Sequence, residues 1–142
     1  LRLMATWIPQ RPASGRLQSE QQSTAVLAIG QSAPLAFSGL GRAGLLVAVQ
    51  CSHPAWFTLY SAAAARSKDA ERLITTDPAS GSGVLLDAAL EADQELLLPP
   101  GCTYLNAEEP GSALLYGLVR RHTGSGDAAV VSVQLRAMVL AL

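Results

Sequence analysis

Few residues of this sequence have side chains suited to act as nucleophiles, bases or metal ligands. Cys51 and His53 lie two positions apart, and Cys102 and His122 are the remaining cysteine and histidine. A closed structural zinc site needs four ligands, usually in two closely spaced pairs, and the second pair is missing here. Either histidine could serve as a base beside an aspartate, but no Gly-x-Ser-x-Gly turn or other nucleophile signature accompanies them. We therefore expect no metal site and no catalytic residues.

One glycine pattern matches a nucleotide-binding motif in its letters only. Residues 39–44, GLGRAG, fit G-x-G-x-x-G, in which glycines let the backbone approach a pyrophosphate at the start of a helix. A valine-containing run follows instead of a helix pattern, and the next acidic residue is Asp69. Residues 81–83, GSG, lack the Gly-Lys-Ser/Thr of a phosphate-binding loop. Both segments are predicted to be turns, and we expect no cofactor.

These residues lie among short strand-like runs separated by turn residues. The runs are 1–8, 24–29, 33–37, 45–51, 55–60, 84–88, 94–98, 102–105, 113–119 and 129–139. Gly30-Gln31-Ser32 predicts a hairpin or bent pair between the second and third runs, and Pro34 favours a sheet edge for the third run or a position near the start of that strand. A short loop at 123–127 predicts a hairpin between the last two runs. In the final run every second residue is apolar, which indicates one buried face.

The stretch from Pro54 to Leu90 changes its periodicity three times. Residues 55–60, AWFTLY, alternate between two faces and predict a strand. Residues 61–71 have the strongest helix propensity of the chain, and the Ser61 hydroxyl could cap that helix. Asp77-Pro78 and the following glycines favour a turn before the next strand. The sequence therefore predicts a mainly β fold, an antiparallel two-sheet β-sandwich of jelly-roll or immunoglobulin-like kind with one short helix near 61–71, in a single domain over 1–142.

The same stretch carries a resemblance to a known group of proteins. It includes FTLY at 57–60, AAAR at 63–66, Asp69-Ala70, Arg72, Ile74, TDP at 76–78 and GVLLD at 83–87. This succession resembles a domain that recurs in structural proteins of tailed bacteriophages, usually in tail-fibre, baseplate or minor tail components. The resemblance covers about residues 43 to 105 and implies a β-sandwich located in the virion. The motif contains no reactive group whose role could be carried over.

Composition limits the partners. Ten basic and eleven acidic residues give a net charge of −1, so we expect no attraction to nucleic acid and no membrane partner. Only 15% of the residues are charged, against about 25% in a typical domain. Part of the surface is therefore expected to be covered by copies of the chain or by other virion proteins. The two cysteines are expected as small buried side chains, with a single bridge between them as the alternative.

Residues 9–22 show no periodicity, although structureless loops longer than about 12 residues are uncommon inside a compact domain. We interpret the segment as an extended arm or surface loop, in which Arg11, Pro12, Arg16 and Leu17 are candidates for contact with a partner. Two charged groups, Glu108-Glu109 and Arg120-Arg121-His122, are interpreted as a solvated loop and a solvated strand end.

The sequence thus predicts a non-enzymatic structural component of a tailed-phage virion, in the tail, baseplate or fibre attachment. Two alternatives stay open, a capsid decoration protein and a carbohydrate-binding module of a fibre that recognises a host surface glycan. The second alternative needs exposed aromatic side chains as a stacking platform, and Trp56, Tyr60, Tyr104 and Tyr116 are the candidates. Packing of these aromatic side chains in the core is the competing interpretation.

Overall fold

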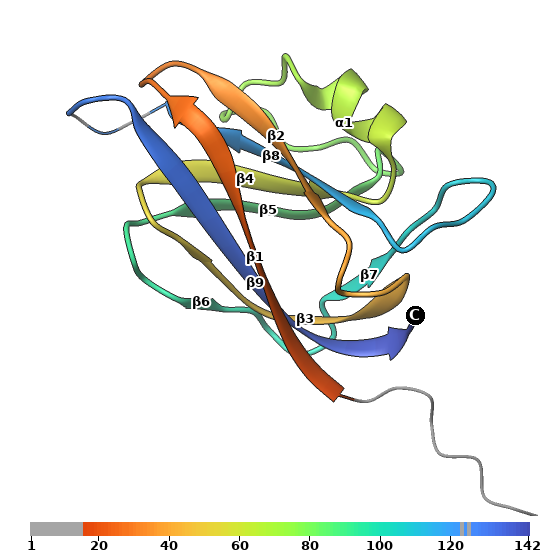
Figure 1. The fold of residues 1–142 in the computed structure, drawn as a ribbon. Coiled ribbons are helices and arrows are strands. Elements are labelled where there is room, and N and C mark those ends of the chain that lie inside the picture. The colour runs from red at the N-terminus through yellow and green to blue at the C-terminus, as the bar shows by residue number, and fades with distance from the viewer. Residues whose placement is uncertain (1–15, 123, 125) are drawn as a thin grey trace, which may run out of the picture.

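The computed structural model describes residues 16–122, 124 and 126–142, and they form nine strands and one helix (Figure 1). The strands are β1 (Arg16–Leu27), β2 (Ser32–Phe37), β3 (Ala43–Cys51), β4 (Ala55–Tyr60), β5 (Val84–Leu90), β6 (Leu96–Leu97), β7 (Thr103–Leu105), β8 (Leu115–Arg120) and β9 (Ala129–Ala141), and the helix is α1 (Ala63–Asp69). The sequence located all of these elements except residues 16–23 of β1.

The strands form two antiparallel sheets that pack face to face. One sheet has the order β1-β9-β3-β6, with β7 also paired to β3, and the other has the order β2-β8-β4-β5. Because β6 and β7 are short and share the same partner, they take the place of one interrupted strand. If β6 and β7 are counted together as the sixth strand, β8 becomes the seventh strand and β9 the eighth. The first sheet then has the strand order 1-8-3-6, and the second sheet has the order 2-7-4-5. This is the jelly-roll arrangement, so the predicted two-sheet sandwich is confirmed in its jelly-roll form.

The core lies between the two sheets. Alternation along each strand sends one set of side chains inward, as Val131, Val133 and Leu135 show in β9. Phe37 and Phe57 meet edge to face with ring centroids 6.2 Å apart, a favourable geometry for aromatic pairs. These contacts hold the sheets together and fix which face of each strand points outward.

Neither of two connections for which the sequence predicted a hairpin is one; the hairpin at 123–127 is wrong, and at 30–31 only the bent-pair alternative remains. Runs 24–29 and 33–37 fall in β1 and β2, and runs 113–119 and 129–139 fall in β8 and β9, yet each pair is split between the two sheets. A Gly-containing loop can turn the chain within one sheet or cross to the opposite one, and the local residues do not distinguish these geometries. The edge position predicted from Pro34 is confirmed, because β2 is the outermost strand of its sheet.

The predicted arm falls partly on a strand. Residues 16–22 belong to β1, which pairs with β9 from Arg16 opposite Val139 to Ser23 opposite Ser132. Apart from Leu17, their side chains are polar on both faces of this edge strand, so no alternation is visible in the sequence. Arg11, Pro12 and the predicted strand 1–8 lie outside the described residues. Contact of Arg16 and Leu17 with a partner stays a prediction.

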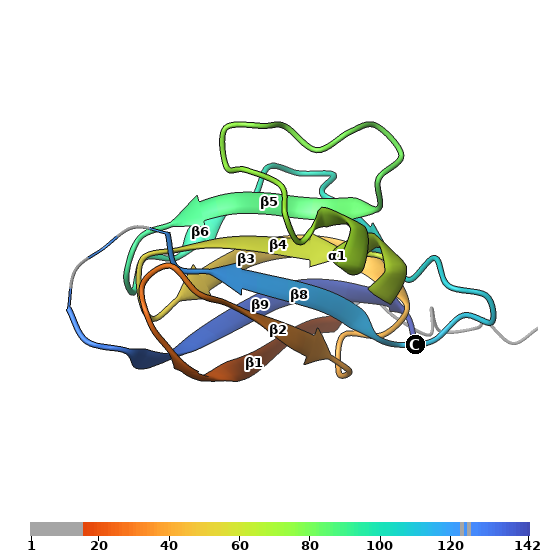
Figure 2. The ribbon, with the colours of Figure 1, turned by 90° about the horizontal axis from the view of Figure 1, so that it is seen from above.

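Helix α1 and the loop that follows it lie on the outer side of the β2-β8-β4-β5 sheet (Figure 2). The helix confirms the element predicted near 61–71, but the predicted Ser61 cap is wrong. The N-cap residue is Ala62, without a side-chain cap, and the backbone N–H of Ala63 donates to Glu108 Oε2 at 3.3 Å. No helix in the described part of the chain is long and apolar enough to span a membrane.

Candidate functional site

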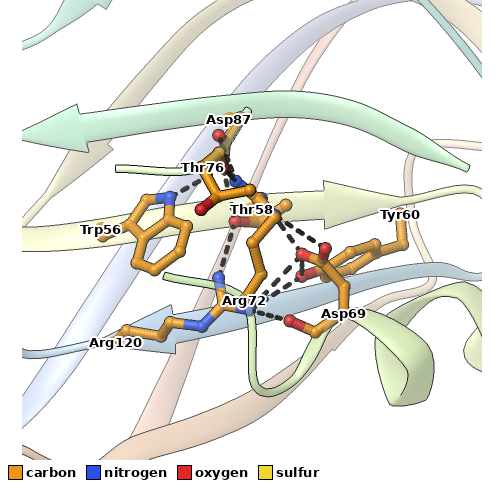
Figure 3. A network of polar contacts seen from close by, with 8 residues as sticks. All are labelled: Trp56, Thr58, Tyr60, Asp69, Arg72, Thr76, Asp87 and Arg120. Carbon is orange, nitrogen blue, oxygen red and sulfur yellow. Dashed lines mark hydrogen bonds and ion pairs between the residues drawn. The ribbon is translucent and has the colours of Figure 1, made fainter. Parts of the chain in front are cut away.

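A network of charged side chains fixes residues 61–83, here called the cover segment, to the outer face of the β2-β8-β4-β5 sheet (Figure 3). Arg72, in the loop after α1, lies at its centre. Its guanidinium donates to Asp69 Oδ1 at 2.7 Å and Oδ2 at 3.1 Å, and to Asp87 Oδ1 at 3.0 Å and Oδ2 at 3.1 Å. It also donates to the carbonyl oxygen of Thr76 at 2.9 Å. One cation therefore links α1, the loop and β5.

The strands beneath supply the other half of the network. Arg120 of β8 is 2% exposed, donates to the Asp69 backbone oxygen at 2.6 Å and lies with its Cζ 3.9 Å from the centroid of the Trp56 ring. Trp56 and Thr58 of β4 donate to Asp87 Oδ1 at 2.7 and 2.8 Å. The alternation of β4 and its register with β5 and β8 place these groups on one face.

The environment keeps both carboxylates ionised. Burial raises the pKa of Asp69, but hydrogen bonds from Arg72 and Tyr60 outweigh it, so this pKa lies below its usual value. Burial likewise opposes ionisation of Asp87, and hydrogen bonds from Arg72, Thr58 and Trp56 bring its pKa below the usual value. Burial and the hydrogen bond to Asp69 raise the pKa of Tyr60 to about 12. Two arginines thus face two carboxylates, and the charges balance.

This arrangement suits a structural role, in which the charged network holds the cover segment on the sheet. Arg66 of α1 adds to it by donating to the carbonyl oxygens of Leu35 at 3.0 Å and Gly117 at 3.3 Å, which joins the helix to β2 and β8. A cleft of about 590 Å³ lies between α1 and the loop. The buried carboxylate and guanidinium that line it, Asp69 and Arg72, already bind each other, so neither is free to act as an acid or a base.

Among the described residues, neither histidine is paired with an aspartate or a glutamate, and the two histidines have different neighbours. His53 Nδ1 lies 2.8 Å from Ser52 Oγ, whereas His122 packs against Trp56 with ring centroids 5.3 Å apart. The Cys51 thiol is buried in β3, which raises its pKa, and both cysteines are free. No group of three His, Cys, Asp or Glu side chains in the described ranges could hold a metal ion.

The glycine-rich segment at 39–44 leads into β3 rather than into a helix. Gly41 has a φ of 73°, and Cβ atoms built on Gly41 and Gly44 would collide with the carbonyl oxygens of Ala141 and Met138. These glycines therefore allow β3 to lie close to β9. Residues 39–42 form a bend before β3, in line with the predicted turn, whereas residues 43–44 already belong to β3. Residues 81–83 form a turn before β5, as the sequence predicted.

The interpretation of Arg120 and Arg121 as a solvated strand end is wrong. The two residues are 2% and 3% exposed, and Arg121 donates to the carbonyl oxygen of Leu27 at 2.7 Å. Glu108 is also engaged, because it accepts a hydrogen bond from Tyr116 Oη at 2.7 Å, which holds its pKa below the usual value. The available signal was the apolar run before Arg120, which indicates a buried strand, but the partners come from distant segments.

The four aromatic side chains considered for sugar stacking do not form a platform. Trp56, Tyr60 and Tyr104 are 3%, 0% and 2% exposed, so none of them offers a free ring face. Tyr116 is half-buried, and the Arg66 guanidinium lies over its ring at 5.2 Å. These four residues support packing, which was the competing interpretation.

The other sheet has an outer face that no described segment covers with a comparable network. At one end of it, the strand register places Leu17 of β1 opposite Met138 of β9, and Met138 opposite Leu45 of β3. Leu140 lies two residues after Met138 on β9, and Leu105 of β7 lies opposite Ala43, two residues before Leu45 on β3. Leu17, Leu105 and Leu140 are 55%, 51% and 46% exposed. These five residues are called the apolar sheet face below. A solvated sheet normally alternates apolar-in and polar-out, so the apolar sheet face is a candidate contact surface.

Comparison with known proteins adds no identification. No protein-family model matches the chain, and no curated protein matches its sequence.

Proposed function

We propose that this protein is a non-enzymatic structural component of a tailed-phage virion, in the tail, baseplate or fibre attachment, which assembles with copies of itself or with other virion proteins. The observation that carries the assembly part is the apolar sheet face. Leu17, Met138 and Leu45 form a continuous cross-strand row, and Leu105 and Leu140 extend it. Contiguous exposed apolar surface of this kind marks contact sites in proteins that are otherwise well folded.

The charge distribution supports the same conclusion. None of the five residues of the apolar sheet face is charged, and the chain as a whole carries few charges. Interfaces are depleted of charged residues at their centre. The opposite sheet is closed by its own cover segment, which leaves the β1-β9-β3 face as the side available for a partner.

The virion part of the proposal rests on the resemblance of residues 43–105 and on the fold. Jelly-roll sandwiches occur in viral capsid proteins and in lectins. A shared fold is an analogy and not a function, so the experiment has to test assembly and location separately.

Assembly is tested by size-exclusion chromatography with light scattering on the full chain. We expect a defined oligomer, and we expect Leu105→Glu combined with Leu140→Glu to shift it to the monomer. Leu73→Glu is the matched control, because Leu73 is 68% exposed but lies in the cover segment on the other side of the molecule. Unchanged urea midpoints would show that both variants fold.

A monomeric wild type that also fails to bind any protein of the purified particle would refute the proposed assembly. Dissociation by Leu73→Glu, with no effect of the Leu105 and Leu140 substitutions, would refute the assignment of the interface. Location is tested by labelling intact particles with an antibody against the chain, and absence from the particle would refute the virion role.

A further inference from the structure

The polar end of the same outer sheet face forms a small, regular site that the proposed assembly does not use. The strand register aligns Gln21 of β1, Gln134 of β9 and Gln50 of β3 in one cross-strand row. The next row contains Ser23, Ser132 and Ser52. A cleft of about 220 Å³ is lined by the three glutamines together with Cys51, Ser52, Ser132 and Asp93.

The hydroxyls of the serine row already form hydrogen bonds within the protein. Ser23 Oγ and Ser132 Oγ are 2.8 Å apart, and the Ser132 backbone N–H donates to Ser52 Oγ at 2.9 Å. Ser52 Oγ in turn lies 2.8 Å from His53 Nδ1. The hydroxyls are thus held in place by one another and by the backbone.

The glutamine row, in contrast, has side-chain amide donors and acceptors that remain available for a ligand. Gln50 Nε2 donates to the Asp93 backbone oxygen at a long 3.3 Å. The side-chain amides of Gln21 and Gln134 have no hydrogen-bond partner among the described residues. Each amide offers two N–H donors and one carbonyl acceptor, so neighbouring amides in a row present donors and acceptors at strand spacing, about 4.8 Å apart.

The chemistry of the lining excludes several classes of ligand. Within the described ranges, no lysine or arginine lines the cleft, so it has no cation for a phosphate or sulfate. The described lining also contains no aromatic or large aliphatic side chain, so an apolar ring would find no partner surface. A neutral ligand whose groups both donate and accept hydrogen bonds fits amides, hydroxyls and one carboxylate.

We propose that this cleft binds a neutral saccharide, as a single pyranose unit of a glycan. Its volume lies below the range of about 300 to 1,000 Å³ typical of sites for drug-sized ligands, which suits one ring. Gln21 and Gln134 would contact ring hydroxyls from below, and the Asp93 carboxylate would accept hydrogen bonds from hydroxyls at the rim. Without an aromatic platform, the dissociation constant is expected to be about 1 mM or weaker.

The test is NMR titration of the full chain with glucose, galactose, mannose, rhamnose and N-acetylglucosamine, with the glutamine side-chain amide signals as the readout. We expect at least one sugar to shift the Gln21, Gln50 and Gln134 signals. Gln134→Ala should abolish the shift, and Gln22→Ala should preserve it. Gln22 is the matched control, since it follows Gln21 on β1 but donates to Glu20 on the opposite face.

Three results would overturn the proposal: no sugar of the panel shifts the signals, the shift persists in Gln134→Ala, or inorganic phosphate shifts the same amides more strongly than any sugar does. Circular dichroism of each variant shows whether it folds. The oligomeric state, measured on the same samples, tests the proposed assembly independently of the sugar site. A monomer that binds sugar would support the site and refute the assembly.

Discussion

Replacement of Arg72 by Met tests whether the charged network fastens the cover segment. Arg72 donates five hydrogen bonds, which go to the carboxylates of Asp69 and Asp87 and to the Thr76 carbonyl oxygen. Methionine keeps much of the aliphatic stem but removes the charge and every donor. The two carboxylates would then remain in place without their shared cation.

The expected loss of unfolding free energy in Arg72→Met follows from the burial of the charged groups and from the hydrogen-bond partners that the two carboxylates keep. The side chains of Arg72, Asp69 and Asp87 are 8%, 10% and 26% exposed, and removal of one partner from a buried pair costs about 3 to 5 kcal/mol. Asp87 keeps its hydrogen bonds from β4, and Asp69 keeps the one from Tyr60, so we expect the lower end, about 3 kcal/mol. For a chain of this length, that loss lowers the melting temperature by roughly 6 to 12 °C.

Urea unfolding followed by tryptophan fluorescence measures this free energy, and hydrogen exchange of residues 70–83 measures local opening of the cover segment. Lys68→Met is the matched control, because Lys68 is an exposed cation on the same segment and should change stability by less than about 0.5 kcal/mol. Arg72→Lys keeps a charge but lacks the planar fork that reaches two carboxylates at once. It should therefore recover only part of the loss.

Equal effects of Arg72→Met and Lys68→Met would refute the reasoning, since the network would then contribute no more than a solvated surface charge. Full recovery by Arg72→Lys would also count against it, because charge alone would then account for the stability and the bidentate geometry would not matter.

The remaining predictions concern pH and packing. The pKa values of Asp69 and Asp87 are lower in the folded chain than in the unfolded chain. Their contribution to the free energy of unfolding is therefore present above about pH 3.9, the unfolded value, and is lost as pH falls through the folded values. Urea titrations between pH 7 and acid should show this loss, and Arg72→Met should make the loss smaller. The pKa of Tyr60 is raised to about 12, so stability should decline as pH rises above about 10. Gly117→Ala should cost about 1 to 3 kcal/mol in thermal unfolding, because its Cβ would meet Phe57 Cε1 at 2.8 Å.

The sequence predicted the fold class because its signals are local. Alternation along 129–139 and the aromatic run at 55–60 identify strands without knowledge of their neighbours, and Ala-rich residues identify the helix. The order of the strands depends on which loops cross between sheets, and nothing in the residues of those loops separates a crossing from a hairpin. For that reason neither connection is the hairpin that the sequence suggested, although the strands on both sides were located.

The charged network could be predicted only in part, for a related reason. The alternation in 55–60 correctly placed Trp56, Thr58 and Tyr60 on one face. Arg120 reaches that face only because β8 is the neighbour of β4, and Arg72 reaches it from a loop without periodicity. A buried arginine at the end of a strand looks, in sequence alone, the same as a solvated one.

The two sheets differ in how their outer faces are completed, and this difference supports an assignment of roles. One outer face is covered by the chain itself, with Asp69, Arg72, Asp87 and Arg120 paired beneath the cover segment. The other has no such cover among the described residues, and it presents leucines at one end and unpartnered amides at the other. Exposed leucines cost free energy in a monomer, so a second molecule would stabilise the chain most where it covered Leu17, Leu105 and Leu140. The side-chain amides at the other end can be hydrated by water without a cover, so that end can remain open to a ligand when the apolar end is buried.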